Sequence, residues 1–330
     1  MAVRKSHLGT HPASKKNQIH SAQKRNQNRR SFLEALEDRT VMAAITGGTG
    51  TGGFELANGT SELEIWLDAS DVNGNFVADQ PSDGTAIANW EDKSGHNRDF
   101  DDLIGDPNLV YVGANGQPTV NFDGDDALRT NLTNNNPRNF IDGNGAFTLI
   151  SVARYTGGDN ERVIAARTGH NWLFGFHGGS SNRNGHYDGW GSLDPAAGGG
   201  YSNGDTNWHL HANQMNVFND ANNPAGDWWR DGILVDNDNR GTGDSFANNV
   251  PDGLSLGAWS GLGESSKAEV SELIMYNRAI SNSENQILQN ALSAKYSLGI
   301  GALDKYAGDG AGAGEYDQDV FGIGMADAFS

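Results

Sequence analysis

Short runs in which apolar and polar residues alternate follow one another from about residue 60 onward. The run 63–67 (LEIWL) is typical, because its alternation predicts a strand with Leu63, Ile65 and Leu67 on one face. Clusters of Gly, Asn and Asp bound each run, as expected of turns between short strands. Further strands are predicted at residues 119–122, 147–155, 162–166, 172–176, 209–218, 254–258 and 269–276.

One pair of runs has the signature of a tight hairpin. Residues 228–230 and 233–235 are separated by Asp231 and Gly232 alone. A two-residue Asp-Gly connection between apolar runs predicts a hairpin, because both turn positions need a positive φ.

A single segment has the helical period. Ser281 and Glu284 have the spacing of a capping box, and Gly299 is placed to end the helix. One apolar stripe follows from Ile287, Leu288, Ala291, Leu292 and Tyr296. Residues 60–300 are therefore predicted to be all-β, an antiparallel β-sandwich with one C-terminal helix.

Composition agrees with many short strands joined by turns. Glycine is the commonest residue, with 45 of 330, and apolar residues make up only 36%. The absence of cysteine excludes disulfides, thiol nucleophiles and cysteine-based zinc sites. No run approaches the roughly 18 to 20 consecutive apolar residues of a membrane-spanning helix, so no membrane span is expected.

Charge divides the chain into a basic start and an acidic body. Residues 1–44 contain nine lysines and arginines and three acids, a net charge of +6. The remaining residues carry a net charge of −25, which gives −19 for the whole chain. An acidic body repels nucleic-acid phosphates and anionic membranes, so neither is an expected partner. Its carboxylates would instead attract divalent cations.

The basic N-terminus is too polar to fold by itself, and residues 1–30 are predicted to be disordered. Residues 29–44 resemble the "RR…FExLExRxLLA" sorting segment at the start of large exported bacterial surface proteins. The matching residues are Arg29, Arg30, Phe32, Glu34, Leu36, Glu37, Arg39 and Ala43. The resemblance implies a secreted or cell-surface protein, while a basic nucleic-acid-binding arm is the alternative. Residues 45–59 then form a Gly/Thr linker.

Several phrases in the body resemble, in order, the LamG-like jellyroll family of the concanavalin A-like superfamily. They are 63–70 (LEIWLDAS), 90–95 (WEDKSG), 118–128 (PTVNFDGDDAL), 147–154, 254–257, 268–280 (AEVSELIMYNRAI) and 283–298. The resemblance implies a jellyroll over residues 60–300 and a lectin-like binding role. Residues 301–330 resemble the segment that follows such jellyrolls, and are predicted to be the incomplete start of another module.

One loop has the composition of a calcium site. Its oxygen-bearing side chains surround Gly74 and could wrap around Ca²⁺. The candidate metal ligands are Asp68, Asp71, Asn73, Asn75 and Asp79. The alternative is a loop in which these side chains bond only to their own backbone.

Aromatic and histidine side chains supply the other candidates. Trp66 and Trp90 are predicted to fill the core. The expected ligand-binding aromatics are Trp190, Trp228, Trp229 and Trp259. His209 and His211 would share one strand face and could chelate a metal, although packing is the default for such a pair.

The acids do not form a catalytic pattern. Glu269 and Glu272 are three residues apart and are expected on opposite strand faces. The E-x-D-x-x-E arrangement of glucanases with this architecture is missing, so no enzyme activity is expected. The leading prediction is an extracellular module that binds carbohydrate or a surface or matrix protein, with Ca²⁺ shaping its loops. A structural or adhesion spacer and a glycoside hydrolase of the same fold are the alternatives.

Overall fold

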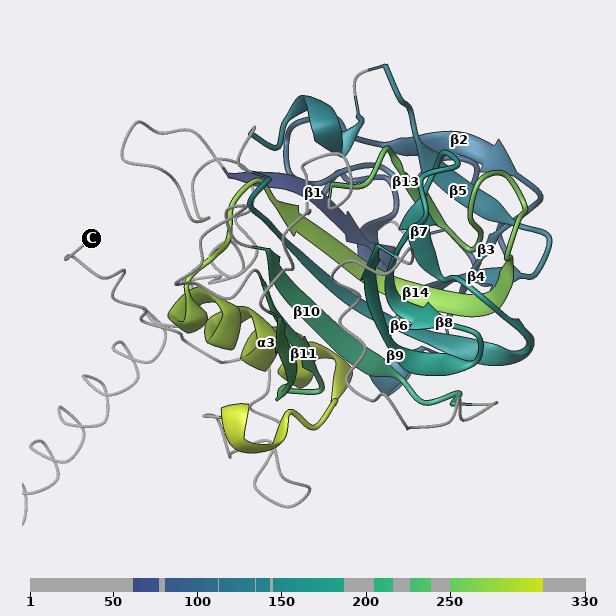
Figure 1. The fold of residues 1–330 in the computed structure, drawn as a ribbon. Coiled ribbons are helices and arrows are strands. Elements are labelled where there is room, and N and C mark those ends of the chain that lie inside the picture. Colours follow the sequence, from purple (N-terminus) through teal and green to yellow (C-terminus); the bar gives the residue numbers. More distant parts are fainter. Residues whose placement is uncertain are drawn as a thin grey trace, which may run out of the picture. The chain divides into compact units, whose positions relative to one another are not determined.

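The computed structural model describes residues 62–76, 81–111, 113–133, 135–142, 145–186, 205–215, 226–238 and 250–304. Within these ranges, strands form two antiparallel sheets that pack face to face (Figure 1). The predicted antiparallel sandwich with one C-terminal helix is confirmed for this part of the chain. The predicted sorting segment, the linker and residues 305–330 lie outside the described ranges.

The larger sheet has eight strands, in the order β12-β11-β10-β6-β14-β4-β3, with β1 also beside β14. One side of β14 (Ser266–Tyr276) pairs with β6 (Phe147–Asn160). Its other side pairs first with β4 and then with β1, so those two strands share one edge of β14. The remaining strands of this sheet are β1 (Leu63–Asp68), β3 (Asn108–Val110), β4 (Thr119–Asp123), β10 (His209–Met215), β11 (Gly226–Arg230) and β12 (Ile233–Asp238).

The smaller sheet has six strands, in the order β2-β5-β13-β7-β8-β9, and covers one face of the larger sheet. Its strands are β2 (Phe100–Ile104), β5 (Ala127–Thr130), β7 (Ile164–Ala166), β8 (Trp172–His177), β9 (Ser180–His186) and β13 (Leu254–Leu256). Between the sheets lies the main core, where alternate residues of each strand point inward. Trp90 is fully buried there, as predicted.

A helix covers the other face of the larger sheet. Helix α3 (Asn282–Tyr296) lies beside β10 and β11 in Figure 1, and its apolar stripe packs on Ile150 and Ile274. The predicted capping box between Ser281 and Glu284 is present. The helix ends earlier than predicted, because Ser297 and not Gly299 takes the left-handed conformation, with φ of 49°. Among the described residues, no helix has the length and apolarity to cross a membrane.

Two irregularities in strand pairing overturn predictions made from simple alternation. The register of β1 shifts between Leu63 and Ile65, and Leu63 joins the helix-side cluster while Ile65 faces the other sheet. The register of β14 shifts between Val270 and Glu272. That extra residue brings Glu269 and Glu272 to the same, helix-facing side, whereas a regular strand would separate them. Sequence alternation cannot reveal such a shift.

The predicted hairpin between β11 and β12 is confirmed. Asp231 and Gly232 have φ of 51° and 71°, as a two-residue turn of this kind requires. A Cβ atom on Gly232 would lie 2.0 Å from the carbonyl oxygen of Ile300. Glycine is therefore needed here both for the turn and for the close approach of the chain after α3.

A cluster of buried charges joins β1, β14 and α3. Lys295 on the helix lies 2.9 Å from Asp68 and 2.9 Å from Glu272, and Lys93 lies 3.2 Å from Asp68. The indole nitrogen of Trp66 and the hydroxyl of Tyr296 both donate to Glu272, at 2.9 Å and 2.8 Å. Every carboxylate in the cluster thus has cationic or hydrogen-bonding partners, as burial of charge demands.

The cluster moves pKa values in opposite directions. Burial alone would raise the pKa of Asp68, but the charges of Lys295 and Lys93 outweigh it and hold that pKa well below its usual range. Burial alone would lower the pKa of Lys295, but Glu272 and Asp68 outweigh it and raise that pKa. The resulting stabilisation is complete between about pH 4 and pH 10, the ordinary values of the two groups. It is lost as the pH falls through the lowered pKa or rises through the raised one.

We expect Lys295→Met to lower the free energy of unfolding by about 3 kcal/mol, because two buried carboxylates lose their shared cation. Urea denaturation at pH 7 measures the change. The matched control is Lys267→Met in β14, a partly exposed lysine outside this cluster, whose effect should stay within about 0.5 kcal/mol. Equal losses for the two variants would contradict a stabilising role for the cluster.

Candidate functional site

Three polar side chains from separate segments meet at one end of the sandwich. Glu161 directly follows β6, His177 is the last residue of β8, and Glu264 precedes β14. Strand pairing explains the meeting, because Asn160 at the end of β6 lies opposite Ser266 at the start of β14. The turn after β8 is tied to the same place by a 2.6 Å hydrogen bond from the amide of Gly179 to the carbonyl of Asn160.

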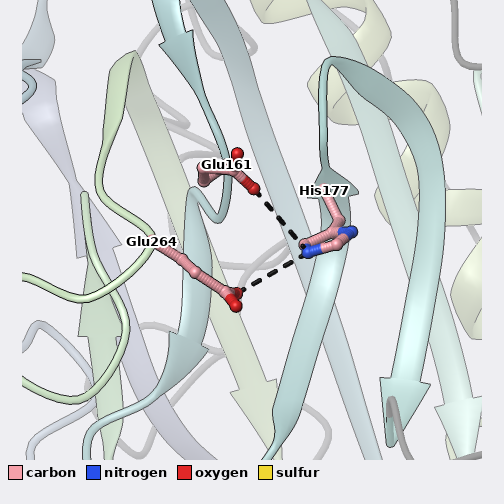
Figure 2. Close-up of side chains that lie close together, drawn as sticks. All are labelled: Glu161, His177 and Glu264. Carbon is pink, nitrogen blue, oxygen red and sulfur yellow. Dashed lines mark ion pairs between the residues drawn. The ribbon is translucent and has the colours of Figure 1, made fainter.

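Both carboxylates approach the same ring nitrogen of His177 (Figure 2). Its Nε2 lies 3.8 Å from Oε2 of Glu161 and 3.6 Å from Oε2 of Glu264. These distances exceed those of a good hydrogen bond. The glutamate side chains are 46% and 36% exposed and the histidine 12%, so the group is open to solvent mainly through the acids.

A buried arginine holds one side of this group. Arg162 is 1% exposed, and its Nε lies 2.5 Å from Oε2 of Glu264. Its guanidinium also donates to Oδ1 of Asn171 and lies 4.4 Å from the centre of the Trp259 ring. The indole nitrogen of Trp259 donates to the carbonyl of His170 at 2.8 Å. Arg162 therefore fixes both a carboxylate and a partly exposed aromatic ring.

The loop that carries Trp259 and Glu264 has a strained backbone. Ser260 and Glu264 have φ of 43° and 46°, in the left-handed region that non-glycine residues rarely adopt. The amide of Trp259 donates to the carbonyl of Gly263 at 2.8 Å and closes the loop. Strain of this kind costs on the order of 1 kcal/mol or more per residue, and it is often found at functional sites.

The arrangement offers two kinds of chemistry. The carboxylates and the imidazole are hydrogen-bond acceptors and ligands for divalent cations. The Trp259 ring beside them is a flat apolar surface. Polar groups next to an aromatic face are the usual lining of a small-molecule site.

The predicted calcium loop has a different role. Asp68 pairs with Lys93 and Lys295, and Asp71 pairs with Lys93 at 3.0 Å. Asp71 also accepts the amides of Asn75 and Phe76 at 3.2 Å and 3.0 Å, as in the backbone-bonded alternative. Because lysine ammonium groups occupy these carboxylates, the described residues of the loop do not fit a Ca²⁺ site. Asp79 lies outside the described residues, and Asn73 lies in the turn after Asp71.

The predicted ligand-binding tryptophans separate into three groups. Trp228 is fully buried and stacks on His211, with ring centres 5.9 Å apart. Trp229 is 7% exposed and packs in the helix-side cluster. Neither ring offers an open face to a ligand, because adjacent strands and α3 cover them. Trp259 is partly exposed beside the three polar groups, and Trp190 lies outside the described residues.

The two histidines of β10 share one strand face, as predicted, with ring centres 5.8 Å apart. Each bonds to protein groups in an arrangement unlike a chelate. His209 bridges Asp231 at 2.7 Å and Asp205 at 3.0 Å. Nε2 of His211 lies 2.8 Å from the carbonyl of Ser181. The two histidines therefore have a structural role in packing and hydrogen bonding, which is the default for such a pair.

No sequence pattern identifies Glu161, Arg162, His177 or Glu264 as a site. Glu161 and Arg162 are adjacent, but His177 and Glu264 lie in other segments, and no spacing along the chain joins the three segments. Only the Trp259 prediction pointed to this end of the sandwich. The pairing of β6 with β14 brings these segments together, and the sequence does not reveal that pairing.

Comparisons with known proteins give no family and only distantly similar solved structures. No model of a protein family matches the chain, and no curated protein matches it. Among solved structures, a mutant Trypanosoma rangeli sialidase with trans-sialidase activity is 14% identical, with a TM-score of 0.43 over 82% of this chain. This chain spans only 39% of that sialidase.

Two further solved domains are similar at the same level. Domain 4 of a GH43 extracellular arabinanase from Geobacillus stearothermophilus, solved with arabinotriose, is 15% identical, with a TM-score of 0.41. The match covers 68% of this chain and 96% of that one. The binding domain of Botulinum neurotoxin DC, solved with SialylT, is 13% identical, with a TM-score of 0.41, over 70% and 52% of the two chains.

Burial of His211 makes stability depend on pH. Burial lowers the pKa of His211 to about 3, and the neighbouring His209 acts in the same direction. The unfolded chain binds a proton near pH 6.5 that the folded chain does not take up until about pH 3. We therefore expect the free energy of unfolding to fall by about 1.4 kcal/mol per pH unit below pH 6.5 from this residue.

Urea denaturation of wild type and His211→Gln between pH 7.5 and pH 4.5 tests this dependence. The variant should start less stable but lose less stability as the pH falls. His96→Gln, which removes a partly exposed histidine, should keep the wild-type slope. Parallel curves for wild type and His211→Gln would contradict the assignment.

Proposed function

We propose that residues 60–300 form a LamG-like jellyroll module that binds carbohydrate without acting on it. The binding surface consists of Trp259, Glu161, His177 and Glu264. One observation carries the proposal: the buried Arg162 contacts both the partly exposed ring of Trp259 and the carboxylate of Glu264.

The chemistry of this surface suits a sugar ring. A saccharide has an apolar face, which can pack on an indole, and a rim of hydroxyl groups, which donate hydrogen bonds to carboxylates. Charged acceptors form the stronger hydrogen bonds of this type. Because Arg162 and the closed loop already hold Trp259 and Glu264 in place, binding would cost little additional ordering.

The pairing of Glu264 supports a binding role over hydrolysis. A glycosidase needs one protonated carboxyl group as its acid and a second, ionised one. Arg162 holds Glu264 in an ion pair at 2.5 Å, so this carboxylate is fixed against the protein instead of being free to approach a glycosidic bond. A spacer or adhesion unit is the other alternative to a binding module, and it predicts no glycan ligand.

Export to the cell surface is part of the proposal and comes from the sorting-type segment at residues 29–44. A surface location fits a module that meets carbohydrate outside the cell. Calcium is left out of the proposed function, because lysines hold the acids of the predicted calcium loop.

Glycan-array screening followed by calorimetry on the best ligand tests the proposal. Trp259→Ala should weaken binding by about 2 kcal/mol, roughly 30-fold, since it removes the stacking face. Trp208→Ala is the matched control, because Trp208 is also partly exposed and also stacks on an arginine, 4.9 Å from Arg154. It should leave the affinity unchanged.

Each alternative gives a distinct result. An array without hits would favour the spacer. Release of new reducing ends from labelled glycans would favour a hydrolase. Equal effects of the two tryptophan variants would place the binding surface elsewhere on the module.

A further inference from the structure

The donor atoms around His177 are separated by distances near those between the ligands of one metal ion. A tetrahedral Zn²⁺ ion with bonds of about 2.0 to 2.1 Å holds its ligand atoms roughly 3.4 Å apart. The Nε2 of His177 lies 3.8 Å and 3.6 Å from the two carboxylates, close to that separation. All three donor atoms lie within 4.8 Å of one another. A small rotation of Glu161, the more exposed glutamate, would bring its carboxylate to the same separation around one ion.

The charges of these residues favour the binding of a cation with moderate affinity. Glu161 and Glu264 contribute two negative charges and Arg162 one positive charge, so the group is anionic when His177 is neutral. A divalent ion would relieve the repulsion between the carboxylates. Arg162 competes with the ion for Glu264 but also fixes the orientation of that carboxylate, as outer partners of metal ligands commonly do.

The donor set distinguishes between classes of metal. Imidazole suits Zn²⁺ and its transition-metal neighbours, whereas Ca²⁺ takes six to eight oxygen ligands. Figure 2 shows both acids directed at the ring nitrogen of His177, so an ion here would bind nitrogen and oxygen together. We propose that Glu161, His177 and Glu264 bind a divalent transition-metal ion, with Zn²⁺ as the best fit. This proposal does not depend on carbohydrate binding.

Calorimetric titration of the chelator-treated full chain with ZnCl₂, and in parallel with CaCl₂, tests the site. Wild type should bind one more equivalent of Zn²⁺ than His177→Ala. Glu161→Gln, which keeps the size of an exposed side chain and spares the fold, should bind that equivalent at least 10-fold more weakly. Titration with Co²⁺ should give visible absorption bands in wild type that His177→Ala lacks.

The matched control is His96→Ala. His96 also lies near a glutamate, 4.0 Å from Glu64, and is 35% exposed. It should bind Zn²⁺ like wild type, so that background binding by the other histidines of the chain cancels in the comparison. Identical Zn²⁺ titrations of wild type, His177→Ala and Glu161→Gln would overturn the proposal. Ca²⁺ binding tighter than Zn²⁺ binding at these residues would overturn the class of metal.

Discussion

Buried carboxylates need cations, and the contact of Lys295 with Asp68 and Glu272 satisfies that need where the helix packs on the larger sheet. The three residues come from the helix, from the first strand and from the long strand β14. An acid left unpaired there would be costly, so these elements are held in one relative position. Lys93 extends the cluster and lies 4.3 Å from the centre of the Trp66 ring.

The same constraint shapes the candidate site at the end of the sandwich. Arg162 is almost fully buried, and its contacts with Glu264 and Trp259 place a carboxylate and an indole side by side. Because the body is strongly acidic, its few buried cations decide which carboxylates are neutralised internally and which face solvent. The acids around Lys93 and Lys295 belong to the first kind. Glu161, which is 46% exposed, belongs to the second.

Strand irregularities decide where several of these groups point. The extra residue in β14 turns Glu272 toward α3, where Lys295, Tyr296 and Trp66 contact it. Without that bulge, alternation would direct Glu272 into the apolar core between the sheets. The shift in β1 likewise moves Leu63 to the helix side, beneath α3. Through these irregularities, β1 and β14 each direct side chains both into the core between the sheets and into the cluster beneath α3.

The sequence by itself determined the fold class, the hairpin at Asp231-Gly232, the capping box at Ser281 and the burial of Trp90, because each depends on local pattern or local geometry. It missed four strands, β2, β3, β5 and β9, whose short or polar runs become strands only through their neighbours. Tertiary structure alone decided that Asp68 meets Lys295 and that Glu161, His177 and Glu264 meet one another. These contacts join residues far apart in the chain through strand pairing and bulges. Neither the strand pairing nor the bulges can be predicted from the local sequence.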